Sequence, residues 1–193
     1  MSALQLDLLE PAPVALPQGL RYRPELISPA DEAALVEEIA ALPFRPFEFH
    51  GYFGNRRTVS FGFRYDFGDR AMHEAEPIPD FLLPVRERAA GFAGLYAAEL
   101  QHALVTEYAH GAGIGWHRDR PVFDDVIGVS LLAPCRFRLR RKRGDTWERA
   151  AMKLEPRSAY LLRGVVRRQW EHSIAPMEGL RYSVTFRSLT EPR

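Results

Sequence analysis

The sequence lacks several features that mark particular classes of protein. Only one of its 193 residues is a cysteine, Cys135, which excludes an internal disulfide framework and leaves no Cys/His cluster with structural zinc spacing. No apolar run approaches the roughly 18 residues that span a bilayer, and the N-terminus lacks the order of a secretory signal. These absences predict a soluble, cytoplasmic protein without a membrane partner.

Charge of one sign is not in excess either, because 26 basic residues nearly balance 25 acidic ones. The basic residues are clustered, however: residues 136–143 read RFRLRRKR, and other arginines gather between residues 56 and 70. A chain of this length with 46% hydrophobic residues suffices for one core and is short for two. We therefore expect an extended N-terminal arm over residues 1–20, followed by a single, monomeric domain over residues 21–193.

Two segments have the periodicity of amphipathic helices. Ser28-Pro29 followed by Asp31 is a helix-start signal, and apolar residues then recur at helical spacing, which predicts a helix over residues 29–41. Residues 83–97 show a second pattern with apolar side chains on one side. Both predicted helices precede the strand-rich half of the chain.

After residue 100 the chain is strand-like almost throughout. In residues 135–140, the apolar Cys135, Phe137 and Leu139 alternate with arginines, so the arginines form an outward stripe. Short strand-like segments are separated by turn residues: 102–109, 126–132, 135–142, 147–154, 158–163, 170–174 and 180–188. These segments predict a mainly β fold with flanking helices and a jelly-roll core.

The most informative motif is Trp116-His117-Arg118-Asp119, together with His172 in a later segment. Residues two apart in an extended segment project the same way, so His117 and Asp119 can present an imidazole and a carboxylate to one point. His172 on a facing strand then completes two nitrogens and one oxygen. Three ligands on one face leave positions open, as in non-haem iron(II) oxygenases. Taken alone, a chance His-x-Asp and a core histidine remain alternatives.

A second motif closes the strand-rich half, where residues 181–187 read Arg-Tyr-Ser-Val-Thr-Phe-Arg. Alternation places Arg181, Ser183, Thr185 and Arg187 on one face, which must point into a barrel or to a polar surface. Two buried arginines need an anionic partner, since an unpaired buried guanidinium is costly. The motif predicts a site for a small dicarboxylate, with a solvated strand face as the alternative.

These motifs occur in an order that resembles the signature of the AlkB family of nucleic-acid dealkylating oxygenases. The match consists of His117-x-Asp119, His172 and the Arg-x-x-x-Thr-x-Arg pattern that starts at Arg181, and it covers roughly residues 40–189. The resemblance implies a double-stranded β-helix and an enzyme that uses Fe(II), 2-oxoglutarate and O2.

The same resemblance assigns roles to individual residues within a catalytic core of about residues 100–189. The implied metal ligands, which are also the catalytic residues, are His117, Asp119 and His172. Arg187 would pair with the 2-oxoglutarate carboxylate near the metal and Arg181 with the distal one. Contacts to the co-substrate are also implied for Tyr108, Thr106 and Ser183. Thr106 and Ser183 stand where the family commonly has asparagine, and their shorter reach weakens those two contacts.

Residues 50–70 are similar in position to the substrate lid of that family. A lid over a flipped base needs positive charge for phosphates and aromatic faces for bases. The segment offers both, in Arg56, Arg57, Phe61, Phe63 and Tyr65. A rim loop packed on its own aromatic residues is the alternative. The arginine stripe in residues 136–143 can likewise track a phosphate backbone or form a solvated strand face.

The function implied by the resemblance is oxidative demethylation of N-alkylated bases in DNA or RNA, as in DNA repair, with release of formaldehyde, succinate and CO2. The signature concerns iron and co-substrate and not the substrate, so tRNA, a protein side chain or a small molecule remain alternatives. A catalytically silent jelly-roll module that holds an anion or a nucleic acid is the alternative outside enzymology. The intact ligand set argues against such a module.

Overall fold

The computed structural model of the chain describes residues 16–49, 52–65 and 72–190. Residues 1–15 of the predicted arm lie outside this range, and so do residues 50–51 and 66–70 of the predicted lid. The last residue predicted for the arm, Leu20, begins the first strand.

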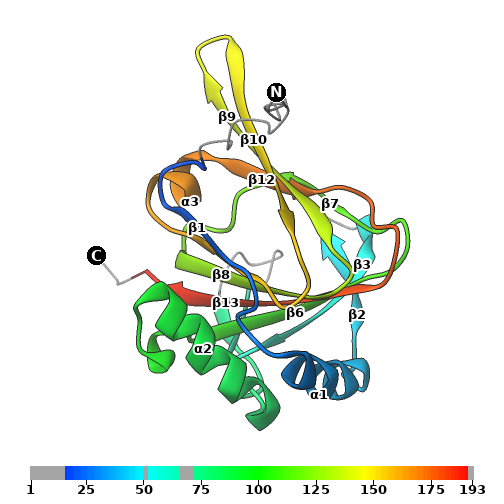
Figure 1. Cartoon of the computed structure of the whole chain (residues 1–193). Coiled ribbons are helices and arrows are strands. Elements are labelled where there is room, and N and C mark those ends of the chain that lie inside the picture. The colour runs from blue at the N-terminus through cyan, green and yellow to red at the C-terminus, as the bar shows by residue number, and fades with distance from the viewer. Residues whose placement is uncertain (1–15, 50–51, 66–71, 191–193) are drawn as a thin grey trace, which may run out of the picture.

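Two antiparallel sheets form the core of the fold (Figure 1). The large sheet has seven strands in the order β1-β11-β8-β13-β6-β3-β2, and the small sheet has four in the order β10-β9-β12-β7. Strands β4 and β5 pair with each other. The strands are β1 Leu20–Arg23, β2 Arg45–Phe49, β3 Tyr52–Phe61, β4 Phe63–Tyr65, β5 Met72–Glu74, β6 His102–Tyr108, β7 Ile114–His117, β8 Phe123–Leu132, β9 Cys135–Arg143, β10 Thr146–Leu154, β11 Ala159–Leu162, β12 Glu171–Ile174 and β13 Arg181–Leu189.

Helices α1 (Pro29–Ala40) and α2 (Leu83–Ala93) cover the large sheet on the side away from the small sheet (Figure 1). A shorter helix, α3 (Val165–Gln169), connects β11 to β12, and 3-10 turns lie at Asp80–Leu82 and Ala97–Glu99. None of the helices in the described ranges is long and apolar enough to cross a membrane. The predicted mainly β fold with flanking helices is confirmed.

The ends of the two long helices follow from local chemistry. Ser28 caps α1, because its Oγ accepts a hydrogen bond from the Asp31 N–H at 3.1 Å while Asp31 Oδ2 accepts one from the Ser28 N–H at 3.0 Å. Helix α2 ends at Ala93 and is capped by Gly94, which has a left-handed φ of 70°. It is therefore shorter than the predicted 83–97, although Leu95 still packs against the core.

Alternation gives the large sheet two different faces. Tyr182, Val184 and Phe186 of β13 are buried in an apolar core shared with α1 and α2, and we call this side the helix face. The other side, the inner face, carries the polar residues between Arg181 and Arg187 and lies toward the small sheet. The small sheet contributes Phe137 and Leu139 to a second core between the sheets, which confirms the alternation predicted in residues 135–140.

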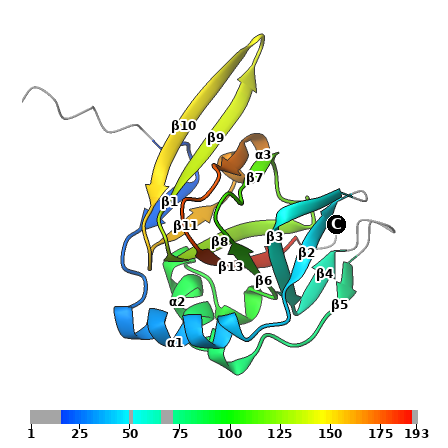
Figure 2. The same cartoon turned by 90° about the vertical axis from the view of Figure 1, so that its right-hand side faces the viewer.

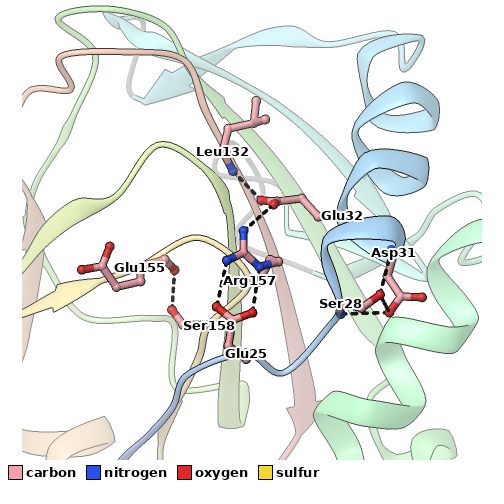
Figure 3. A network of polar contacts seen from close by, with 8 residues as sticks. All are labelled: Glu25, Ser28, Asp31, Glu32, Leu132, Glu155, Arg157 and Ser158. Carbon is pink, nitrogen blue, oxygen red and sulfur yellow. Dashed lines mark hydrogen bonds and ion pairs between the residues drawn. The ribbon is translucent and has the colours of Figure 1, made fainter.

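A polar network joins α1 to three turns at the edge of the core (Figure 3). Arg157 donates two hydrogen bonds of 2.9 Å to the Glu25 carboxylate and one of 3.0 Å to Glu32 Oε2. Glu32 Oε1 accepts a hydrogen bond from the Leu132 N–H at 2.8 Å. Glu25, Leu132 and Arg157 have positive φ angles of 47°, 66° and 62°, a region that side chains with a Cβ rarely adopt. The network therefore holds three strained turns in place.

Glu32→Ala is expected to lower the free energy of unfolding by about 1–3 kcal/mol, because it removes the acceptor of the partly buried Leu132 N–H. The measurement is urea denaturation followed by circular dichroism. Glu37→Ala, an exposed position on the same helix, is the matched control. An equal decrease in the free energy of unfolding in Glu32→Ala and Glu37→Ala would show that the network does not stabilise the turns.

Candidate metal and co-substrate site

Two neighbouring strands of the small sheet bring the predicted metal ligands together. His117 is the last residue of β7 and lies directly opposite His172 of β12 in the antiparallel register. The two imidazole rings have centroids 4.2 Å apart. Asp119 follows just after β7, and its Oδ2 atom lies 3.6 Å from His172 Nε2. The three predicted ligands are thus neighbours in space.

The surroundings favour the protonation states in which these side chains bind metals. Burial, assisted by His117, lowers the pKa of His172 to about 3, and burial also lowers the pKa of His117. Burial opposes ionisation of Asp119, but the charge of Arg187 holds the pKa of that carboxyl below its usual range. At neutral pH the group therefore consists of two neutral imidazoles and one carboxylate.

Two details of the group fit a divalent cation. His117 Nδ1 lies 2.9 Å from the Gly115 carbonyl oxygen. Because a carbonyl oxygen only accepts hydrogen bonds, the ring proton lies on Nδ1, and the lone pair of Nε2 is left to bind a metal ion. Asp119 Oδ2 is buried without a hydrogen-bond partner among the described residues, which is costly for a carboxylate oxygen. Among the described residues, no group of three or more His, Cys, Asp and Glu side chains is arranged in this structure so that it could hold a metal ion. The donor set therefore fits a cation by its chemistry and not by a ready-made geometry.

Arg187 lies between the carboxylate and a third histidine. Its Nη2 atom is 2.8 Å from Asp119 Oδ1, and its Nη1 atom is 3.3 Å from His102 Nδ1. Burial and the charge of Arg187 lower the pKa of His102 well below its usual range, so the imidazole is neutral. In the sequence, His102 has no second ligand-type residue at the spacing of a metal-binding motif. It reaches the site because β6 pairs with β13 and places it opposite Arg187.

Arg181 occupies the other end of the inner face and is only 1% exposed. Its Nε donates a hydrogen bond of 3.0 Å to Ser130 Oγ, and its guanidinium carbon lies 5.1 Å from the centroid of the Tyr108 ring. Its Nη1 atom is buried without a hydrogen-bond partner among the described residues. This guanidinium has no acidic neighbour to neutralise it within the described ranges, so its environment favours an anionic ligand.

The other predicted co-substrate residues line the same inner face. Tyr108 lies directly opposite Arg181, and Thr106 lies directly opposite Ser183. Thr106 and Ser183 are 3% and 5% exposed, so their hydroxyls face the space between the sheets and not the solvent. The structure thus places all five predicted co-substrate residues, Arg181 and Arg187 included, on the inner face of the large sheet.

Tyr160 is a site residue that the sequence did not indicate. It lies opposite Gly128, which in turn lies opposite Thr185, between Arg181 and Arg187. A Cβ atom at Gly128 would lie 2.3 Å from the Tyr160 ring, so glycine is required for the ring to lie there. Burial raises the pKa of the phenol, which therefore stays a neutral hydrogen-bond donor. All four residues of β11 are buried, so no alternation pointed to this one.

Helix α3 contributes a second unpredicted residue. Arg167 is 5% exposed and donates hydrogen bonds to the backbone carbonyls of Arg120 and Phe123. These bonds hold the segment that directly follows Asp119. Arg167 therefore positions the carboxylate through the backbone.

The predicted lid residues of β3 divide between the two faces of the large sheet. Arg56 lies opposite Tyr108 on the inner face, with its guanidinium carbon 3.7 Å from the centroid of the Phe47 ring. Arg57 points to the helix face and forms hydrogen bonds of 2.7 and 2.8 Å with Glu107. Phe61 also points to the helix face, where it is 8% exposed in the apolar core. The structure therefore does not bring Arg57 and Phe61 to the site.

The two remaining lid residues lie in the short strand β4. Phe63 is half-buried there. The side chain of Tyr65 lies outside the described part of the chain. The contact of Phe63 and Tyr65 with a substrate stays a prediction.

A jelly roll that places two histidines and a carboxylate between its sheets has the arrangement of the non-haem iron oxygenases. Comparison with known proteins agrees, because residues 19–187 match the family model of the 2OG-Fe(II) oxygenase superfamily. The chain therefore belongs to the 2OG-Fe(II) oxygenase superfamily, whose members use Fe(II), 2-oxoglutarate and O2.

Two curated relatives and a solved structure are AlkB homologues. The alkylated DNA repair protein ALKBH8 homolog of Arabidopsis thaliana is 28% identical over 180 residues, which cover 81% of this chain and 50% of that protein. The probable RNA/DNA demethylase ALKBH6 of Danio rerio is 27% identical over 111 residues, 58% of this chain and 45% of that protein. The chain thus spans about half the length of the curated relatives it matches.

The structure of OsALKBH1 matches this fold with a TM-score of 0.67 and 15% sequence identity, and the match covers 88% of this chain and 96% of that one. At this identity the likeness concerns the fold alone. Together with the two curated relatives, it confirms the predicted resemblance to the AlkB family.

Proposed function

We propose that this chain is an Fe(II)- and 2-oxoglutarate-dependent oxidative demethylase of N-alkylated nucleic-acid bases. One observation carries the proposal: two buried groups of opposite charge, each with a polar atom that lacks a hydrogen-bond partner among the described residues, lie between the sheets. The Asp119 carboxylate has a buried oxygen without a partner beside two neutral imidazoles, and the buried Arg181 guanidinium lacks an acidic partner among the described residues. The first suits a cation and the second suits an anion.

In this proposal His117, Asp119 and His172 hold Fe(II). The bound metal, with O2 and 2-oxoglutarate, supplies the oxidising power that hydroxylates a carbon–hydrogen bond. Arg181 binds the distal carboxylate of 2-oxoglutarate, with the Tyr108 hydroxyl nearby as a hydrogen-bond donor. Arg187 keeps Asp119 ionised and oriented, and it also faces the carboxylate end nearer to the metal.

An alkylated base as the substrate is supported by the relatives and by one side chain. The curated relatives are named for repair of alkylated DNA and for demethylation of RNA or DNA. Arg56 lies on the inner face, near enough for its charge to help lower the pKa of His117, and it stacks on Phe47. A cation and an aromatic ring beside the site suit a phosphate and a base. Hydroxylation of an N-methyl group on such a base releases formaldehyde.

Arg56→Ala is expected to raise the KM for a methylated oligonucleotide about 10-fold, because it removes a cation from the site side of β3. Arg57→Ala is expected to change this KM less than about 2-fold, because Arg57 points away from the site and pairs with Glu107 on the helix face. The loss of such an exposed ion pair has only a small effect on the free energy of the protein. Steady-state formaldehyde release measures both values. A larger effect of Arg57→Ala than of Arg56→Ala would contradict the assignment of faces.

The substrate class is tested by formaldehyde release from oligonucleotides that carry 1-methyladenine or 3-methylcytosine, in DNA and in RNA, with unmethylated oligonucleotides as controls. The proposal predicts release only from methylated strands. Formaldehyde release from methylated RNA but not from methylated DNA would restrict the substrate class to RNA, tRNA included. If no methylated nucleic acid yields formaldehyde while 2-oxoglutarate is consumed, the substrate belongs to another class, such as a protein side chain or a small molecule.

A further inference from the structure

The side of the small sheet that points away from the large sheet, which we call the outer face, is strongly basic. Register and alternation place six basic side chains on it: Arg136, Arg138, Arg140, Lys142, Arg149 and Lys153. Two acidic side chains lie against them, Glu171 beside Arg140 and Glu155 beside Lys153. The whole chain has a net charge of only +1. Positive charge is therefore concentrated on this face, and none of these residues contributes to the site between the sheets.

This concentration of charge opposes folding of the sheet. Arg140 and Arg149 lie directly opposite each other on neighbouring strands, an arrangement that is destabilising for like charges. Glu171 pairs with Arg140 at 2.6 Å. Arg136, Lys142 and Arg149 are exposed and have no ion-pair partner among the described residues. An anionic partner would relieve this repulsion.

Two tryptophans interleave with the arginines on the outer face. The Arg140 guanidinium carbon lies 4.4 Å from the centroid of Trp116 and 4.2 Å from that of Trp147. Arg138 lies 5.2 Å from the centroid of Trp116 and is held by a hydrogen bond of 3.0 Å to Ser173 Oγ. Flat guanidinium and indole groups in succession provide faces on which unpaired bases stack.

The outer face adjoins the candidate site. Strand β7 is an edge strand of the small sheet, with Trp116 on the outer side and the next residue, His117, on the inner side. From this edge the face extends along the β9–β10 hairpin, which projects beyond the rest of the molecule (Figures 1 and 2). A polymer lying on the hairpin can therefore reach the edge of the site.

We propose that the outer face binds a single strand of nucleic acid, with phosphates on the free basic side chains and bases against Trp116 and Trp147. The bound strand is continuous with the one whose modified base is processed beside His117. This inference rests on the proposed function for the identity of the polymer. Charge complementarity favours a polyanion, and the indole faces favour one with unpaired bases.

The test is fluorescence anisotropy of the full chain with a labelled, unmethylated single-stranded oligonucleotide at several salt concentrations. Lys142→Gln with Arg149→Gln is expected to weaken binding at least about 10-fold and to reduce the slope of log K against log salt by about 2. Trp147→Ala is expected to weaken binding about 10-fold with the slope unchanged. The matched control is Arg21→Gln with Arg23→Gln, which removes the same charge from β1 and leaves binding unchanged.

A Lys142/Arg149 double variant that binds the oligonucleotide like the wild type would overturn the proposal, and so would an equal loss of affinity in the β1 control.

Demethylation of a methylated trinucleotide, too short to span the outer face, separates this inference from the proposed function. If the double variant keeps wild-type activity on the trinucleotide and loses affinity for the long strand, the inference is supported. If the wild type demethylates neither substrate, the proposed function fails, whatever the binding result.

Discussion

His117→Ala is expected to abolish Fe(II) binding and to reduce turnover of 2-oxoglutarate at least about 100-fold, while the chain stays folded. His117 is half-exposed at the end of β7, and its main polar contact is with the Gly115 carbonyl, so its loss leaves no buried charge behind. Iron content after equilibrium dialysis and the thermal unfolding midpoint measure the two effects.

The position of Arg187 makes His117 a better test residue than Asp119. Asp119→Ala would leave the buried Arg187 without its carboxylate partner, which costs several kcal/mol, so loss of activity could follow from unfolding. His110→Ala, at an exposed histidine near the same strand, is the matched control and keeps full iron binding. Iron binding by His117→Ala equal to that of the control would contradict the metal assignment.

Arg181→Met is expected to have two effects of opposite sign. Without a ligand it raises the free energy of unfolding by about 1 kcal/mol or more, because it removes a buried guanidinium that lacks an acidic partner in the described part of the chain. It also weakens 2-oxoglutarate binding about 100-fold, because a charge-assisted pair with the distal carboxylate is lost.

Thermal unfolding with and without 2-oxoglutarate distinguishes the two effects of Arg181→Met. The wild type gains stability from the co-substrate, whereas the variant starts higher and gains much less at the same co-substrate concentration. A variant that is still stabilised by 2-oxoglutarate as strongly as the wild type would show that Arg181 does not bind it. Arg163→Met, which breaks an ion pair with Asp125 elsewhere in the chain, is a control for loss of a partly buried arginine and keeps the co-substrate response.

The parts of the site that could be predicted from sequence have strong local periodicity. In residues 181–187 polar and apolar side chains alternate without interruption, so one face of β13 was identified before its neighbours were known. His117 and Asp119 project together for the same reason. Their proximity to His172 then followed from the pairing of two strands in a small jelly roll.

The parts that could not be predicted depend on which strands pair and in what register. The residues of β3 alternate like any strand, but only the pairing of Arg56 with Tyr108 decides that Arg56 faces the site and Arg57 does not. A shift of one residue would exchange the two faces. His102 and Tyr160 were missed for the same reason, because each is near the site only through a cross-strand neighbour. Arg167 was missed because helix α3, on which it lies, has only five residues, too few to show a helical period in the sequence.

The central claim is that this chain binds Fe(II) and 2-oxoglutarate at adjoining places between its sheets and turns the latter over. The most direct test is succinate formation by the full chain with Fe(II), 2-oxoglutarate and O2, beside His172→Ala and the Glu37→Ala surface variant. We expect succinate from the wild type and from Glu37→Ala, dependent on added iron and oxygen, and none from His172→Ala. Tight binding of an anion or a nucleic acid without succinate from any of the three proteins would contradict the claim and indicate a catalytically silent binding module.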